Sequence, residues 1–121
     1  MLLDLEKLRE EYAEHPLDVS NADPDPFRQL QHWLSDALNA GLPEPNAMTL
    51  ATCTKDGIPS ARVVLLKGLE AGELHFYTNY ESRKGRELEA NPRAAAVFLW
   101  LGLHRQLRVE GRVERLSGEQ S

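Results

Sequence analysis

The chain has 121 residues, of which 41 % are hydrophobic and 27 % are charged, and it carries a formal net charge of −5 at pH 7. This length predicts one domain with its own core, and the acidic balance disfavours a general nucleic-acid or membrane-surface protein, which is usually basic. Cys53 is the only cysteine, so no intrachain disulfide can form and we expect a cytoplasmic location. No segment is apolar over the length of a transmembrane helix.

Residues 1–20 are predicted to form a short amphipathic helix and a flexible flap, ahead of a main domain at 21–121. Four apolar side chains recur at helical spacing among charged ones, namely Leu2, Leu5, Leu8 and Tyr12. The loop that follows, residues 15–25, is rich in Pro, Asp and Asn. We therefore expect the first helix to be only loosely attached to the rest.

A second helix is predicted after this loop. Asp25 is a suitable N-cap, Pro26 suits the first helical position, and Gly41 ends the helix. Its expected buried face consists of six apolar residues, which are Phe27, Leu30, Trp33, Leu34, Ala37 and Leu38.

From Met48 onward the hydrophobic period becomes that of strands. We expect strands over residues 48–54, 61–67, 73–79, 93–100 and 104–116, with a hairpin turn at Asp56-Gly57 and a helix between Arg83 and Asn91. Four apolar residues in a row, Val63 to Leu66, predict a strand covered on both faces.

Clustered strands with short connections predict a mainly β (α+β) fold, with an antiparallel sheet curled into a barrel and flanked by helices. Five strands close a barrel poorly, so a further segment or a second subunit is expected to supply the missing wall.

The usual catalytic patterns do not occur. The four histidines show no metal-ligand spacing with one another, with Cys53 or with carboxylates, so no metal site is predicted. Neither a Gly-rich phosphate loop nor a nucleophile elbow is present, and no residue is assigned a catalytic role.

An unusual charge pattern marks the helix that begins at Arg83. Arg83 and Lys84 lie in its first turn, where the helix dipole disfavours cations. With Ser82 as the N-cap, a bound phosphate would make this placement favourable. A solvated basic face is the alternative. Other polar residues lie at strand ends, and these are Arg62, Lys67, Tyr77, Thr78 and Gln106.

Several long motifs carry a resemblance that spans essentially the whole chain. They are LREEY (8–12), PDPFRQLQHWLSDAL (24–38), RVVLLK (62–67), FYTNYESRKGRELEANPRAAAVFLW (76–100) and RQLRVEGRVERLS (105–117). In this order they resemble the pyridoxamine 5'-phosphate oxidase family. The resemblance implies an FMN-binding split barrel that works as a homodimer, with the flavin at the subunit interface.

The resemblance also implies site residues. Those matching FMN contacts are Arg62, Val63, Val64, Leu65, Leu66, Lys67, Tyr77, Thr78, Arg83, Lys84 and Gln106. Arg83 and Lys84 match the cations that bind the FMN phosphate. Lys67 also matches a residue that holds the substrate phosphate, and Arg9 and Tyr12 match N-terminal residues that close over the substrate.

The implied reaction is oxidation of pyridoxamine or pyridoxine 5'-phosphate to pyridoxal 5'-phosphate, in which a hydride passes to the flavin and O2 reoxidises it to give H2O2. Members of the family continue well beyond the last strand of this chain. We therefore expect the N-terminal portion of such an oxidase, with weak or no activity. Two alternatives are a non-catalytic FMN-binding module on the same scaffold and an oligonucleotide-binding barrel, which the negative charge disfavours.

One geometric problem accompanies the resemblance. Arg62 and Lys67 are an odd number of residues apart, so a regular strand directs their side chains to opposite faces. Both can serve one cofactor if backbone groups contribute, if a bulge intervenes, or if two subunits share the site. We favour backbone contacts combined with a shared site.

Overall fold

The computed structural model describes residues 5, 20–79 and 81–116. The two α-helices are α1 (Pro26–Asn39) and α2 (Arg83–Ala90), and a short 3-10 helix is η2 (Leu101–Leu103). The five strands are β1 (Ala47–Cys53), β2 (Pro59–Glu70), β3 (Glu73–Phe76), β4 (Arg93–Trp100) and β5 (Arg105–Arg112). The predicted N-terminal helix and flap fall almost wholly outside the described residues.

The predicted start and end of α1 are confirmed. The Asp25 side chain accepts a hydrogen bond from the Phe27 N–H at 2.9 Å, Pro26 opens the helix, and Gly41 follows it with a φ of 70°. The prediction for Leu38 is wrong, because this residue is 60 % exposed. It lies one helical position from the fully buried Ala37, and a step of about 100° turns it out of the narrow contact stripe.

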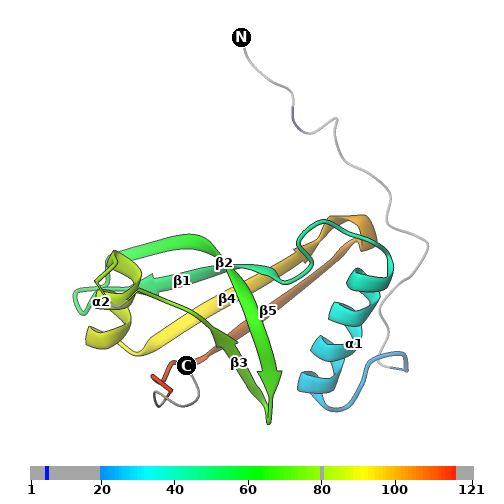
Figure 1. Cartoon of the computed structure of the whole chain (residues 1–121), viewed down its shortest axis with the longest axis horizontal. Helices are drawn as coiled ribbons and strands as arrows, with labels where there is room; N and C mark the ends of the chain where they lie inside the picture. The colour runs from blue at the N-terminus through cyan, green and yellow to red at the C-terminus, as the bar shows by residue number, and fades with distance from the viewer. Residues whose placement is uncertain (1–4, 6–19, 80, 117–121) are drawn as a thin grey trace.

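All five strands form one antiparallel sheet in the order β3-β2-β1-β4-β5. The sheet curls so that the β2–β3 hairpin crosses in front of the other strands, which leaves β3 and β5 as its two edges (Figure 1). A register shift between Leu66 and Gly68 marks a bulge in β2. The predicted split, antiparallel barrel with flanking helices is thus confirmed.

The core lies between α1 and the inner face of the sheet. Its buried residues come from α1, β1, β2 and β4, and they are Leu30, Ala37, Met48, Leu66, Phe98 and Trp100. The Phe98 and Trp100 rings stack at 5.4 Å, and the Trp100 indole N–H donates to the Pro45 carbonyl at 2.8 Å. Because this polar hydrogen is satisfied, the large ring can be buried without leaving an unpaired donor.

The expectation that β2 is covered on both faces is wrong for the described chain. Side chains alternate along β2, so Arg62, Val64 and Leu66 turn inward, whereas Val63 is 66 % exposed. Both helices pack against the inner face, so nothing described covers the other one. The outer apolar face consists of Val63 and Leu65 on β2 and Leu99 on β4, all of which are exposed.

Several strand boundaries also differ from the prediction. β2 runs from residue 59 to 70 rather than from 61 to 67, β3 ends at Phe76 rather than at residue 79, and β5 ends at Arg112 rather than at residue 116. The short helix η2 was not predicted. Tyr77 and Thr78 therefore lie in the connection between β3 and α2, just outside the ladder. This connection leads directly into the helix whose first turn carries the cations.

Candidate functional site

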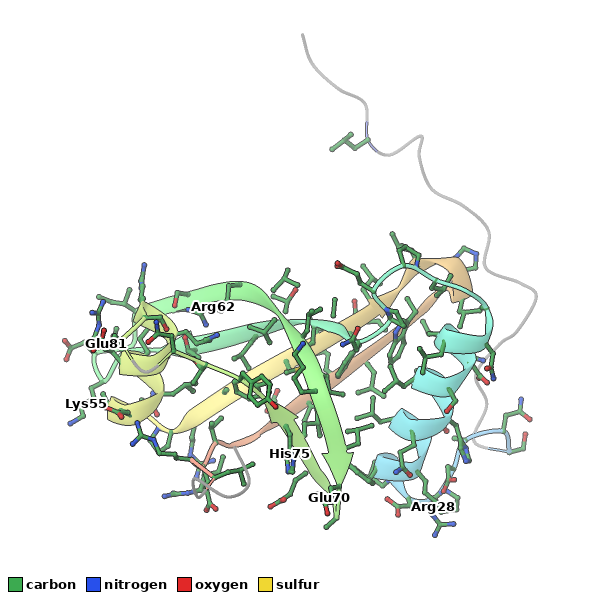
Figure 2. The ribbon with its side chains drawn as sticks, viewed as in Figure 1. Arg28, Lys55, Arg62, Glu70, His75 and Glu81 are labelled. Atoms are coloured by element: carbon green, nitrogen blue, oxygen red, sulfur yellow. The ribbon has the colours of Figure 1, made fainter. Side chains whose placement is uncertain are left out.

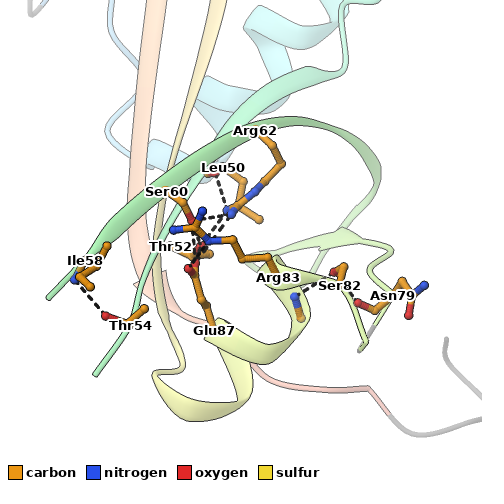
Figure 3. Close-up of polar contacts among 11 residues, drawn as sticks. Leu50, Thr52, Thr54, Ile58, Ser60, Arg62, Asn79, Ser82, Arg83 and Glu87 are labelled. Atoms are coloured by element: carbon orange, nitrogen blue, oxygen red, sulfur yellow. Dashed lines mark hydrogen bonds and ion pairs between the residues drawn. The ribbon is translucent and has the colours of Figure 1, made fainter. Parts of the chain in front are cut away.

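The site is built around the first turn of α2, at the end of the sheet opposite α1 (Figure 1). Ser82 is its N-cap: its hydroxyl oxygen accepts from the Gly85 N–H at 3.1 Å, and the hydroxyl donates to the Asn79 carbonyl at 2.6 Å (Figure 3). This cap was predicted. It fixes the direction in which the remaining N–H groups of the first turn point.

Arg83 has an intramolecular partner that the sequence analysis missed. Its Nε–H donates to Glu87 Oε1 at 3.0 Å, one helical turn along, and the Glu87 side chain is only 6 % exposed. The i,i+4 spacing of the two residues was visible in the sequence. The burial of the carboxylate was not, because it depends on how α2 docks on the sheet.

Arg62 reaches the same carboxylate from β2 through two hydroxyls. Its Nη1 donates to Thr52 Oγ1 at 2.7 Å and to the Leu50 carbonyl at 3.1 Å, and its Nη2 donates to Ser60 Oγ at 2.7 Å. Thr52 and Ser60 in turn donate to Glu87 Oε2 at 2.5 and 2.7 Å. Arg62 is therefore held in one orientation beside α2 (Figures 2 and 3).

These contacts explain the state of the Glu87 carboxyl. The hydrogen bonds from Thr52 and Ser60, followed by the contacts with Arg83, lower the pKa of Glu87 to about 2, although burial acts in the opposite direction. Hydrogen bonds to the ionised form are the stronger influence here. Glu87 is consequently an anion throughout the physiological range.

Lys84 is the third cation of the cluster. Burial, followed by repulsion from Arg62, lowers the pKa of Lys84, and no ion pair joins it to a carboxylate of the described residues. Arg62 and Arg83 thus share the carboxylate of Glu87, and Lys84 lies close enough to Arg62 to be repelled by it. The cluster has a net charge of +2 and favours an anion with two negative charges.

A second unsatisfied group lies close by in the chain. Thr78 Oγ1 is buried and has no hydrogen-bond partner among the residues that the structure describes. It lines a pocket of about 850 Å³ together with Lys67, Tyr77 and Gly85. A buried hydroxyl without a partner is unfavourable, so a ligand that supplies a partner would be stabilising.

The other predicted contacts are distributed over both faces. Val64 and Leu66 turn inward, Val63 and Leu65 turn outward, and Lys67 is exposed at the bulge. Gln106 is exposed on β5, opposite Leu99. The structure brings Arg62, Arg83 and Lys84 together but leaves Gln106 three strands away from β2. Arg9 and Tyr12 lie outside the described residues.

No group of three or more His, Cys, Asp or Glu side chains suited to a metal ion occurs in the described part of the chain. Its helices also include none that is long and apolar enough to cross a membrane.

The curled sheet and its helices define a split β-barrel. The sequence model of the family described as "Pyridoxamine 5'-phosphate oxidase" matches residues 34–121, and the chain belongs to this family. A "Pyridoxine/pyridoxamine 5'-phosphate oxidase" of Salinibacter ruber is 57 % identical over 117 residues, which are 97 % of this chain and 54 % of that protein. The chain therefore spans about half the length of the curated relatives it matches.

Solved structures agree with this fold. The crystal structure of PhzG from Burkholderia lata 383, in complex with tetrahydrophenazine-1-carboxylic acid, has a TM-score of 0.80 and 32 % identity, covering 84 % of this chain and 50 % of that one. A pyridoxamine 5'-phosphate oxidase-related, FMN binding protein from Nostoc punctiforme gives 0.66 at 21 % identity, covering 81 % and 53 %. The second likeness concerns the fold alone.

Proposed function

We propose that this chain binds FMN and carries the flavin half of an oxidase that converts pyridoxamine or pyridoxine 5'-phosphate to pyridoxal 5'-phosphate. The observation that carries the proposal is the cation excess at the start of α2, where Arg62 and Arg83 share one carboxylate and Lys84 pairs with none of the described residues. A phosphate monoester has a charge of roughly −1.5 to −2 at pH 7, which matches this excess.

The proposed FMN phosphate site consists of Arg62, Arg83, Lys84 and the first N–H groups of α2. Thr78 Oγ1 fits the flavin site because it is a buried hydroxyl that lacks a hydrogen-bond partner among the described residues. Tyr77 would offer an exposed ring, and the remaining contacts are assigned to residues 63–67 and Gln106. Because β2 alternates, Val63 and Leu65 would face the flavin from the outer side, and Val64 and Leu66 would contribute backbone groups.

When bound, FMN would supply the two-electron acceptor, with O2 as the final oxidant and H2O2 as product. The chain's own residues would bind and orient the two phosphate compounds. Lys67 is proposed to hold the substrate phosphate, and Arg9 and Tyr12 to close over the substrate, so all three would act by positioning.

The outer apolar face supports a homodimer with FMN at the interface. Val63, Leu65 and Leu99 expose apolar side chains on one face of the sheet, and a second copy would remove them from water. The single cysteine suits a cytoplasmic location. We expect analytical ultracentrifugation to show a dimer. A monomer at all protein concentrations would contradict the proposed homodimer.

The proposal is tested by titrating the purified chain with FMN and with riboflavin, which lacks the phosphate. We expect FMN to bind more tightly than riboflavin, and the double variant Arg83→Ala/Lys84→Ala to lose this preference. The matched control Arg105→Ala/Arg108→Ala removes the same number of cations from β5. An FMN preference that survives in the first variant would overturn the phosphate site.

A non-catalytic FMN-binding module on the same scaffold is the second candidate, because one fold can host different functions and the cations at α2 are groups that bind an anion. Anaerobic mixing of the FMN-loaded chain with pyridoxine 5'-phosphate separates the two. Loss of the flavin's visible absorbance would support the oxidase, whereas an unchanged spectrum at saturating substrate would support the module.

A further inference from the structure

The two oxygens of the Glu87 carboxylate have different surroundings. Oε2 accepts from the hydroxyls of Thr52 and Ser60, which are fixed to β1 and β2. Oε1 accepts from Arg83, whose side chain is 62 % exposed. One oxygen is therefore bound to the rigid sheet, while the partner of the other can turn into solvent.

The two arginines differ in the same way. Arg62 makes three hydrogen bonds to the sheet and lies 3.7 Å from Glu87 Oε2, with its side chain 24 % exposed. Among the residues that the structure describes, Arg83 makes a single side-chain hydrogen bond, to Glu87. Glu87 keeps its two hydrogen bonds from the sheet when Arg83 turns away, so Arg83 can exchange this carboxylate for another anion at low cost.

We propose that Glu87 is an internal counter-ion of the phosphate site, which pairs with Arg83 when no phosphate is bound and releases it to the phosphate of FMN. Three cations held together without a counter-charge would repel one another, and repulsion from Arg62 adds to burial in lowering the pKa of Lys84. Glu87 therefore stabilises the anion-free protein and competes with the ligand for Arg83. The inference rests on the proposed function.

Glu87→Gln is the direct test, because the amide is nearly isosteric with the carboxylate. Its oxygen can accept from Thr52 and Ser60, so the hydroxyls that orient Arg62 keep their partner. Its NH2 group cannot accept from Arg83, which is then available to the phosphate. At low salt we expect the affinity for FMN to rise by roughly threefold to tenfold and the affinity for riboflavin to stay the same.

Glu89→Gln is the matched control. It lies two residues further along α2, is exposed, and pairs with Arg115 at 2.7 Å. The substitution changes the net charge of the chain equally without touching the cluster, so both affinities should remain at the wild-type value. An equal rise of FMN affinity in this control would show a general charge effect and overturn the proposal.

The ratio of FMN to riboflavin affinity separates a counter-ion from a purely structural role. If Glu87→Gln lowered the affinities for FMN and riboflavin equally, the role of Glu87 would be structural. If it lowered the affinity for FMN alone, Glu87 would promote phosphate binding. Either result overturns the proposal. It is supported by tighter FMN binding together with a lower melting temperature of the flavin-free variant.

If Glu87→Gln does not fold, a comparison of two other variants still tests the proposal. Lys84 pairs with no carboxylate in the described part of the chain, whereas Arg83 must leave Glu87. Lys84→Gln should therefore cost more FMN affinity than Arg83→Gln. An equal or larger loss in Arg83→Gln overturns the proposal. A wild-type chain that does not prefer FMN to riboflavin contradicts the proposed function instead, so the two failures are distinguishable.

Discussion

The two ends of the sheet each hold an arginine from a strand beside a helix, and they use it differently. At the α1 end, Arg105 pairs with Asp36 at 2.8 Å and lies 4.9 Å from the centre of the Trp33 ring. At the α2 end, Arg62 shares Glu87 with Arg83, and Lys84 repels it.

The two ends differ in their balance of charge. At the α1 end one cation meets one carboxylate and one aromatic ring, so charges are balanced within the chain. At the α2 end the cations outnumber the carboxylate, and an added anion would relieve the imbalance. Under the proposed function, the α1 end contributes stability and the α2 end would bind the phosphate.

The largest expected effect comes from truncating one core side chain at the α1 end. Phe98 is fully buried, at 0 % exposure, and Phe98→Ala should lower the free energy of unfolding by about 3–5 kcal/mol. Urea unfolding measures this loss. The exposed Leu101→Ala control should change it by less than about 0.5 kcal/mol.

Phe98→Ala also tests the division of roles. In folded protein the ratio of FMN to riboflavin affinity should stay at the wild-type value, because the α2 cluster is intact. A lower ratio would mean that the core at the α1 end shapes the phosphate site.

The next effect compares the two arginines directly. Arg62→Gln removes the cation that donates to the hydroxyls of Thr52 and Ser60 and leaves the buried Glu87 with Arg83 alone. It should cost about 1–3 kcal/mol of stability. It should also reduce FMN affinity at least about tenfold, the scale of one lost charged hydrogen-bonding group.

Arg105→Gln is the counterpart at the α1 end. It should cost at most about 1 kcal/mol and leave the affinity for FMN unchanged. Both properties are measured by urea unfolding and flavin titration. Equal losses of FMN affinity in the two variants would remove the distinction between the ends.

Local signals in the sequence predicted much of this comparison. The caps at Asp25 and Ser82, the strand of β4 and the cations at Arg83 and Lys84 each depend on residues within a few positions. The fold class followed from the order of these elements. FMN and the oxidase reaction came from the family resemblance rather than from residue chemistry.

The network around Glu87 could not be predicted in this way. It requires Thr52 to lie opposite Ser60 in the β1–β2 register and α2 to dock above both, and these are contacts between distant segments. The exposure of Val63 was missed for a related reason. A run of apolar residues indicates burial but does not tell whether the covering surface belongs to the same chain.

The stability of the chain at acid pH should depend on the buried Glu87 carboxylate at the α2 end. The pKa of Glu87 is lowered from 4.5 to about 2 in the folded chain, so the unfolded chain binds its proton first as the pH falls. The stability that Glu87 contributes is complete above pH 4.5 and is lost as the pH falls towards about 2.

Unfolding by urea at steps between pH 5 and pH 2.5 measures this loss. In Glu87→Gln the free energy of unfolding should depend less steeply on pH over this range, while Glu89→Gln should keep the wild-type slope. Equal slopes in wild type and Glu87→Gln would show that the network does not hold the carboxylate ionised.

The smallest expected effect lies in the β2–β3 turn, away from both the α1 end and the α2 end. It shows how small a change in the free energy of unfolding can be measured. Ala71 and Gly72 have φ values of 53° and 79°, as a two-residue type I′ turn requires, and alanine is strained there. Ala71→Asn should therefore add roughly 0.5–1 kcal/mol to the free energy of unfolding.

Gly72→Ala is the reciprocal control. A Cβ at this position would meet no heavy atom within 4 Å, so any loss, which we expect to be about 1 kcal/mol, comes from backbone strain alone. Neither variant should alter the affinity for FMN. If neither variant changed the free energy of unfolding, the turn would not be strained. Urea unfolding would then have shown no effect of the size expected here, and changes below about 1 kcal/mol at the α2 end would carry no weight for individual contacts.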